Sequence, residues 1–291
     1  MSAHDRGAAV PADLLRRRVA DDPSNPLVTF YDDATGERVE LSARTFDNWV
    51  AKTANFLVDG LGAEPGTRAV LVLPPHWQTA VWLMACWSAG IVAEPVDPAE
   101  VKVRAGEPAG APRPYPEEGA ATGDAPYILA AAREVLDDVV DDADAEEIVG
   151  LSLHALGAPL ADCPPGVTDY ADEVRGYGDR FAPGAEVTPE TPALSVTNAT
   201  FTGGELVAAA REAVEKWELD ARDRLLVDMP FTTLDGVLIA LLAPLASGAS
   251  VIIQRNFDKA AQDRRLAVEH VTVVAGLPGP NDASGSLYRL P

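Results

Sequence analysis

The sequence predicts an α/β fold with two similar subdomains, each holding a mostly parallel sheet flanked by helices. Three observations predict it. Short apolar runs alternate with helix-length segments along most of the 291 residues. Apolar residues make up 47% of the chain and charged residues 23%, which excludes a disordered, collagen-like or coiled-coil chain. Finally, two stretches match at an offset of 156 residues, the distance from Arg68 to Arg224.

The first hundred residues predict a hairpin and then a helix–strand–helix–strand series. Strands Leu27–Tyr31 and Arg38–Leu41 flank a turn that contains Asp and Gly, which is typical of a β-hairpin. Apolar positions from Phe46 to Val58 recur at helical spacing, so a helix follows. We next expect strand Ala69–Leu73, a helix over Trp77–Ala89 that is apolar nearly all round and therefore buried, and strand Ile91–Ala93.

The rest of the chain continues the alternation after residues 98–125, whose Pro, Gly and Ala content predicts a loop or linker. The expected strands are Tyr127–Leu129, Ile148–Leu153, Ala193–Thr197, Arg224–Asp228, Ser250–Gln254 and Val271–Ala275. The expected helices are Ala131–Val140, a short piece near Tyr170–Tyr177, Gly204–Trp217, Leu234–Ala246 and Asp258–Glu269. Helical crossovers between strands imply parallel pairing.

The repeat gives the domain boundaries. Leu71 matches Val227, and Pro74 matches Pro230, at the offset that joins Arg68 to Arg224. Two pseudo-equivalent subdomains explain this run of matches. We expect a first α/β subdomain with the hairpin at 1–97, the linker at 98–125, the remainder of that subdomain with a connection at 126–190, and the second subdomain at 191–291.

The charge of the chain excludes one class of partner. It holds 45 acidic and 23 basic residues, for a net charge of −22. Nucleic acids and anionic membranes attract Lys and Arg, so neither is an expected partner. Only two cysteines, Cys86 and Cys163, are present, and the histidines have no ligand spacing, so we expect no disulfide framework and no metal site.

The apolar segments do not predict a membrane protein. The most apolar run, Leu234–Ile253, contains Pro244 and glycines and therefore predicts a buried helix followed by a strand. The amino-terminal residues are polar and lack the apolar segment of a signal peptide. We expect a cytoplasmic protein with no membrane span.

Two stretches together carry a resemblance to a known family. They read NPLVTFYDDATGERVELSARTF through IVAEPVDP, and DARDRLLVDMPFTTLDGVLIALLAPLASGASVIIQRNFD followed by HVTVVAGLP. These resemble the adenylate-forming enzymes, which include acyl-CoA synthetases, luciferases and peptide-synthetase adenylation domains. The resemblance covers residues 20–98 and 190–279. It implies the N-terminal domain fold of that family, without its C-terminal domain, and a chemistry that uses ATP and Mg.

The resemblance implies a phosphate-binding loop after strand Ala193–Thr197. In the family this loop is rich in Ser, Thr and Gly and carries one Lys. The candidate residues here are Thr197, Thr200, Thr202, Gly203 and Gly204. No Lys or Arg lies between Arg180 and Arg211, so backbone N–H groups and hydroxyls alone would have to hold the phosphates. The same residues also fit a capping box at the start of the next helix.

The resemblance also implies an acyl pocket with Phe231, Asp235 and Gly276 as candidates. The family carries an aromatic residue or His near the position of Phe231. Core packing would equally suit Phe231, and a first helical turn would suit Asp235. The family's adenine, ribose and Mg ligands and its catalytic Lys lie in segments beyond those that match. We therefore assign no catalytic and no metal residue, and expect a truncated, degenerate relative.

Three functions remain open. The first is a non-catalytic relative of the AMP-forming acyl-CoA synthetases that acts as a binding or scaffold protein. The second is ATP-dependent carboxylate adenylation, with an unusual nucleotide site or a partner chain, and only this activity would require ATP or AMP with Mg. The third is a binder of a small apolar or acyl ligand, with Trp77 and Trp82 beside Phe231. A protein partner or a second copy would cover apolar faces left by the missing half.

Overall fold

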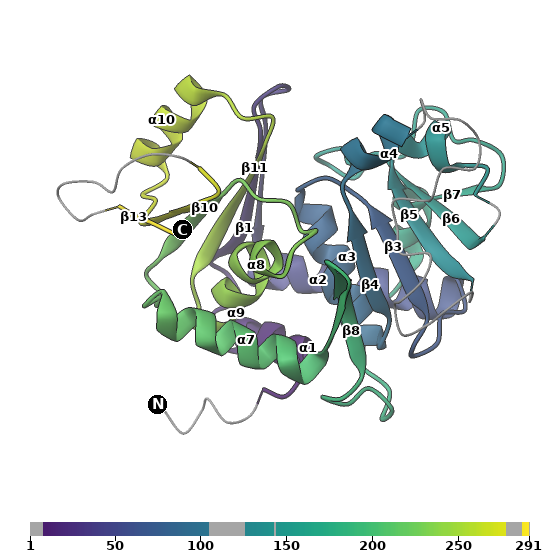
Figure 1. Cartoon of the computed structure of the whole chain (residues 1–291), viewed down its shortest axis with the longest axis horizontal. Helices are drawn as coiled ribbons and strands as arrows, with labels where there is room; N and C mark the ends of the chain where they lie inside the picture. Colours follow the sequence, from purple (N-terminus) through teal and green to yellow (C-terminus); the bar gives the residue numbers. More distant parts are fainter. Residues whose placement is uncertain (1–7, 105–125, 143, 278–286, 291) are drawn as a thin grey trace. The chain divides into compact units, whose positions relative to one another are not determined.

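The computed structural model describes residues 8–104, 126–142, 144–277 and 287–290 (Figure 1). The chain forms two compact units that are interleaved in sequence. Unit 1 contains Met1–Asp47, Pro75–Ala80 and Glu205–Pro291, and unit 2 contains Asn48–Pro74 and Val81–Gly204.

Unit 1 is built on a six-stranded sheet in the order β13-β12-β10-β11-β1-β2. Its strands are β1 (Pro26–Asp32), β2 (Glu37–Ser42), β10 (Arg224–Val227), β11 (Ser250–Arg255), β12 (Val273–Ala275) and β13 (Tyr288–Arg289). All neighbours pair in parallel except β1 and β2, which form the expected hairpin. Because β1 pairs with β11, the hairpin completes the sheet formed by the last third of the chain.

Unit 2 is built on a seven-stranded sheet in the order β7-β6-β5-β3-β4-β8-β9. Its strands are β3 (Arg68–Val72), β4 (Val92–Val96), β5 (Tyr127–Ala132), β6 (Ala145–Leu151), β7 (Val167–Asp169), β8 (Pro192–Val196) and β9 (Ala199–Thr202). Again one edge is antiparallel, between β8 and β9. β3 and β4 are buried at every position, as expected for strands in the middle of a parallel sheet.

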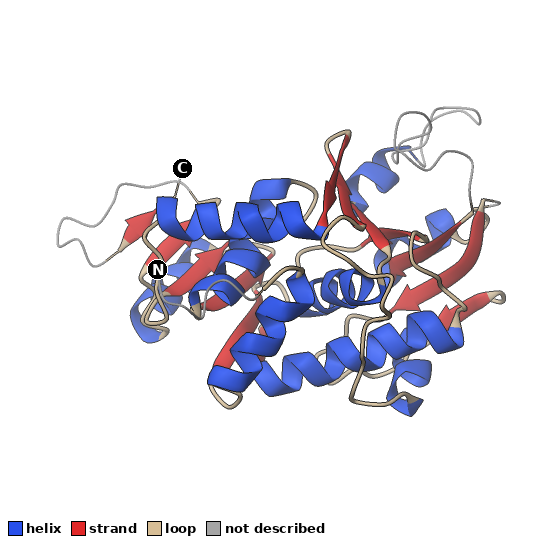
Figure 2. Ribbon diagram, turned by 90° about the horizontal axis from the view of Figure 1, so that it is seen from below, coloured by secondary structure: helices blue, strands red, loops and turns tan. Residues whose placement is uncertain are grey.

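The helices connect and flank these strands (Figure 2). They are α1 (Pro11–Asp21), α2 (Ala43–Asn55), α3 (Trp77–Ala89), α4 (Pro98–Arg104), α5 (Arg133–Val139), α6 (Tyr170–Glu173), α7 (Gly203–Lys216), α8 (Leu234–Val237), α9 (Ala243–Ser247) and α10 (Lys259–Val268). π-Helical turns follow α2 at Phe56–Gly60 and join α8 to α9 at Leu238–Leu242, and a 3₁₀ turn follows α6 at Val174–Gly176. Among the described residues, none of these helices is long and apolar enough to cross a membrane.

The core of unit 1 lies on both faces of its sheet. On one face, Leu226 and Ile252 pack with Val274, and Leu266 of α10 covers them. The π-helical turn between α8 and α9 packs against β10 and β11, and its residues are buried. Since successive residues of a strand point to opposite faces, Leu225 and Ile253 of the same strands belong to the second face.

Several elements differ from the expected ones. The expected loop 98–125 begins with helix α4, because Pro98 suits the first turn of a helix, and residues 105–125 lie outside the described residues. After a two-residue turn at Thr197 and Asn198, residues Ala199–Thr202 form strand β9 and not a loop. The expected contiguous boundaries also differ from the interleaved units, since the hairpin joins the second sheet through β1–β11 pairing. The α/β class with mostly parallel sheets is confirmed.

Candidate functional site

The segment expected to bind phosphates is a tight hairpin in unit 2. β8 and β9 pair so that Val196 lies opposite Ala199, which leaves a two-residue turn of Thr197 and Asn198. Both turn residues have positive φ, 52° and 63°. Two consecutive left-handed residues match the right-handed twist of a two-residue hairpin. Thr197 and Thr200 are exposed, and Thr202 is the last residue of β9.

The two glycines of this segment have already used their N–H groups. Gly203 donates to the carbonyl oxygen of Thr191 at 3.0 Å, and Gly204 donates to that of Pro189 at 2.7 Å. A Cβ atom on Gly204 would lie 2.9 Å from the Pro189 oxygen, so close backbone packing explains this glycine. These residues therefore do not offer the pair of free N–H donors that a phosphate group needs.

The acyl-pocket candidates lie in unit 1, at the carboxyl edge of its sheet. β10 and β12 are neighbours, and the N–H of Asp228 donates to the Ala275 oxygen at 3.1 Å. Gly276 follows β12 with φ of 75°, and a Cβ there would lie 2.2 Å from the Asp228 oxygen. Only glycine fits this close approach of two chain segments.

Phe231 and Asp235 have different surroundings. The Phe231 side chain is 2% exposed and belongs to the core of unit 1. Asp235 is exposed in the first turn of α8, after Thr233, whose hydroxyl accepts from the N–H of Gly236 at 3.1 Å. An acid in the first turn interacts favourably with the helix dipole. The phosphate-loop candidates lie in unit 2 and these three candidates in unit 1.

Sequence reasoning missed a polar network at the same edge of the unit 1 sheet. The Gln254 amide on β11 donates to an Asp228 carboxylate oxygen at 3.3 Å. Its carbonyl oxygen accepts from Arg265, and Arg265 also donates to Asp33. The Arg265 guanidinium lies over the Tyr31 ring, 4.0 Å from its centroid. Gln254 and Arg265 are buried, so this chain of hydrogen bonds holds the Asp228 carboxylate in place.

Burial raises the pKa of the Asp228 carboxyl above its ordinary value. The nearby Asp33 charge raises it further, while the bond from Gln254 and the charge of Arg265 act in the opposite direction. A carboxylate with one weak hydrogen bond at the carboxyl edge of a parallel sheet occupies the place where ligands of such sheets bind. The sequence signal that could have revealed this network is an amide, Gln254, at the end of an apolar strand together with Arg265 at a core position of the following helix.

No group of three or more His, Cys, Asp or Glu side chains among the described residues could hold a metal ion. His76 is completely buried, and burial lowers its pKa to about 3. Its Nδ1 accepts from the N–H of Gln78 at 3.1 Å, so this side chain caps the start of α3 as a neutral imidazole.

Comparison with known proteins identifies the family. A protein of Mycobacterium tuberculosis described as a "TIGR03089 family protein" is 40% identical over 262 residues, which are 90% of this chain and 96% of that protein. The chain belongs to the TIGR03089 family. The family model for the AMP-binding enzymes also matches residues 15–107, and the expected relation to the adenylate-forming enzymes is confirmed.

Solved structures place the fold of this TIGR03089 family member among larger ligases. An acyl-CoA synthetase from Brucella canis has a TM-score of 0.72 at 14% identity, and the match covers 92% of this chain and 47% of the synthetase. An anthranilate CoA ligase in complex with anthranoyl-AMP has a TM-score of 0.71 at 15% identity, over 95% of this chain and 51% of the ligase. The chain thus spans about half the length of these ligases.

Proposed function

We propose that this chain is a non-catalytic relative of the AMP-forming acyl-CoA synthetases that acts as a binding protein. The observation that carries the proposal is the use of the Gly203 and Gly204 N–H groups by the carbonyl oxygens of Thr191 and Pro189. A triphosphate at this position would have to displace two backbone hydrogen bonds and gain no cation, because residues 181–210 contain no Lys or Arg.

The hairpin strengthens this argument. A phosphate-binding loop must bend around the phosphate groups, whereas β8 and β9 are joined by the shortest common hairpin turn. Binding of ATP here would therefore require β9 to separate from β8. The loss of ladder hydrogen bonds and of the turn would offset much of the binding free energy.

Ligand binding is better supported at the carboxyl edge of the unit 1 sheet. Gly276 and Asp228 meet there, and Asp228 presents a carboxylate held by Gln254. This edge keeps the ligand-binding position of an open parallel sheet without any contribution from the β8–β9 hairpin. A binder of an apolar ligand walled by Phe231, Trp77 and Trp82 has less support, because all three side chains are at most 2% exposed.

The rival activity is ATP-dependent adenylation of a carboxylic acid, and one experiment separates the two. The full chain is titrated with ATP and MgCl₂ in a calorimeter up to millimolar ATP. Pyrophosphate release is then assayed with anthranilate and with a series of fatty acids. A known acyl-CoA ligase serves as the positive control in both assays. We expect no saturable heat and no pyrophosphate above the rate without acid.

Saturable ATP binding together with acid-dependent pyrophosphate release would overturn the proposal. That result would make ATP or AMP with Mg the cofactors of this chain. The protein partner or second copy and the cytoplasmic location stay predictions from the sequence. Size-exclusion chromatography with light scattering tests the second copy directly.

A further inference from the structure

The two repeat-related arginines differ in which of their N–H groups are bonded. Arg68 opens β3 and Arg224 opens β10, 156 positions later. Arg68 donates through Nε and Nη2 to the two carboxylate oxygens of Glu94 at 2.9 and 2.8 Å. Arg224 donates through Nη2 to Glu269 and to Thr29 Oγ1 at 3.2 Å, and through Nη1 to Ser250 Oγ at a weak 3.4 Å, while its buried Nε has no hydrogen-bond partner. The Nε N–H of Arg224 is therefore unused, whereas that of Arg68 is bonded to Glu94.

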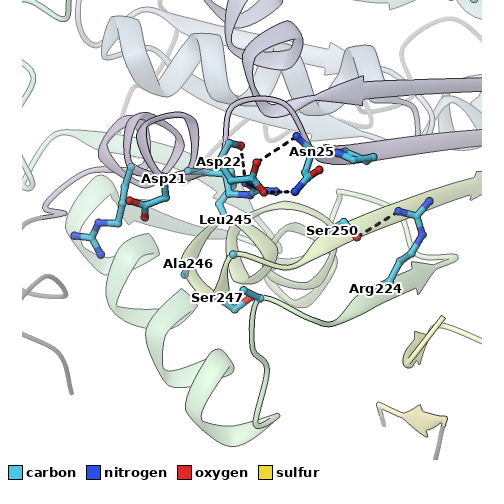
Figure 3. A pocket seen from close by; sticks show the side chains of 13 residues that line it. Asp21, Asp22, Asn25, Arg224, Leu245, Ala246, Ser247 and Ser250 are labelled. Atoms are coloured by element: carbon cyan, nitrogen blue, oxygen red, sulfur yellow. Dashed lines mark hydrogen bonds and ion pairs between the residues drawn. The ribbon is translucent and has the colours of Figure 1, made fainter. Parts of the chain in front are cut away.

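Arg224 borders a hollow at the amino edge of the unit 1 sheet (Figure 3). The hollow has a volume of about 340 Å³ and lies among the ends of α1 and α9 and the starts of β10 and β11. Small residues form part of its wall, namely Ala246, Ser247 and Gly248. This edge is opposite to the carboxyl edge that holds Asp228, so it is a separate site.

A second arginine of the hollow is also under-bonded. Arg18 is 6% exposed, and its Nη1 donates to the backbone oxygen of Asp22 at 2.7 Å and lies 3.3 Å from the Asp22 carboxylate. Its Nε has no hydrogen-bond partner. A buried guanidinium with unused N–H groups favours an acceptor such as a carboxylate of a ligand.

The other side of the hollow is negatively charged. Asp21 is exposed there and makes no hydrogen bond or ion pair with the described residues. Helices α1 and α9 both end at the hollow, which places the negative ends of two helix dipoles there. Arg17 also lines the hollow and already has an interaction of its own. Figure 3 shows Asp21 and Arg224 on opposite sides, with Ala246 and Ser247 between them.

We propose that this hollow binds a small zwitterion that carries one ammonium group and one carboxylate group, such as an α-amino acid. The ammonium group lies toward Asp21 and the two helix ends, and the carboxylate lies toward Arg224 and Arg18. Asp22 already neutralises Arg18, and Glu269 neutralises Arg224, so a ligand without net charge fits better than a phosphate dianion. The site is independent of whether the chain binds ATP.

The test uses the full chain and the twenty proteinogenic α-amino acids as probes. Each is screened at millimolar concentration by thermal shift, and those that stabilise the protein are titrated by calorimetry. Acetate and methylamine at the same concentrations carry one charged group each and serve as controls. We expect saturable binding of at least one amino acid and at least tenfold weaker binding of both controls. Absence of binding by all twenty, or equally tight binding of acetate, would overturn the proposal.

Three variants then locate the binding. Asp21→Asn removes the negative charge that would face the ammonium group while keeping an acceptor oxygen, and it is expected to weaken binding about tenfold. Ala246→Leu fills the hollow and is expected to abolish binding, while circular dichroism checks that it folds. Asp59→Asn changes an exposed aspartate of unit 2 and is expected to bind like the native chain. Unchanged affinity in Asp21→Asn and Ala246→Leu would overturn the assignment to this hollow.

Discussion

Arg68 and Glu94 form a bidentate ion pair inside the unit 2 sheet. Their side chains are 7% and 3% exposed, and the Arg68 guanidinium also lies over the Tyr127 ring. Replacing Arg68 with Ala leaves Glu94 buried without a counter-charge. We expect Arg68→Ala to lower the free energy of unfolding by about 3–5 kcal/mol, measured by urea denaturation.

The matched control for that substitution is Arg222→Ala. Arg222 pairs with Asp220 on the surface, where its side chain is 90% exposed. Solvent screens such a pair, so the control is expected to unfold at the same urea concentration as the native chain. Equal effects of both substitutions would contradict the role of burial at Arg68.

Asp228 gives a pH-dependent prediction. Because burial raises its pKa above the ordinary 3.8, the folded chain binds this proton more tightly than the unfolded chain does. The ionised form therefore destabilises the fold at neutral pH. We expect Asp228→Asn to be more stable than the native chain at pH 7. This advantage is lost as the pH falls through the raised pKa toward 3.8.

Thermal melts of both proteins between pH 4 and pH 8 provide the measurement. A difference in melting temperature that stays constant over this range would show that Asp228 is not the titrating group. Asn keeps the oxygen that accepts from Gln254, so the comparison isolates the charge.

Individual residues were only partly predictable from the sequence. The first-turn position of Asp235 followed from local rules, and the structure has it there. The hydrogen bonds of Arg265 with Asp33 and Gln254 did not follow from local rules, because an Arg between apolar helix positions normally points to solvent. Only the pairing of β1 with β11 brings Asp33 and Gln254 to both sides of that guanidinium.

At the scale of elements, the β8–β9 hairpin yields a direct test. Thr197 is β-branched and has φ of 52°, a conformation that costs such residues about 1–2 kcal/mol. Asn-Gly is the preferred pair for two consecutive left-handed positions. We expect the double variant Thr197→Asn, Asn198→Gly to raise the free energy of unfolding by about 1 kcal/mol, measured by urea denaturation.

An unstructured loop at this place would give a different result. Its unfolding free energy would be unchanged by the double variant, since no left-handed conformation would be enforced. The same change at an extended, exposed position should destabilise the chain. An increase in the unfolding free energy therefore indicates the hairpin, no change indicates a loop, and a decrease indicates an extended segment.

The sequence predicted long, strongly patterned elements better than short ones. Helix α3 has the predicted bounds, Trp77–Ala89, because ten of its thirteen residues are apolar and such a segment predicts a buried helix. β9 was missed because its turn lacks glycine and it has only four residues, of which two are threonines. Pairing with β8, which no local pattern reveals, makes it a strand.

At the scale of the whole molecule, the two units are interleaved. The repeat predicted two subdomains, but the apolar pattern of β1 does not say which sheet it joins. Since β1 pairs with β11, a fragment of residues 191–291 lacks a strand pair that covers β11. We expect this fragment to show no cooperative thermal transition by circular dichroism, whereas the full chain shows one.

A cooperative transition in the fragment would contradict the importance of the β1–β2 hairpin. Adding a separately produced fragment of residues 1–97 is the complementary measurement. Because β1 and β2 supply the missing edge, we expect the two fragments to stabilise each other.

The pairing of β1 with β11 also bears on how the protein is made. A ribosome adds about 5–20 residues per second, so β1 leaves it on the order of ten to forty seconds before its partner exists. All segments of unit 2 are synthesised before β10 and β11. During that interval the apolar side chains of Leu27, Val28 and Phe30, which are buried in the finished fold, have no sheet to join. The nascent chain therefore has a long window in which chaperones can bind its first strand.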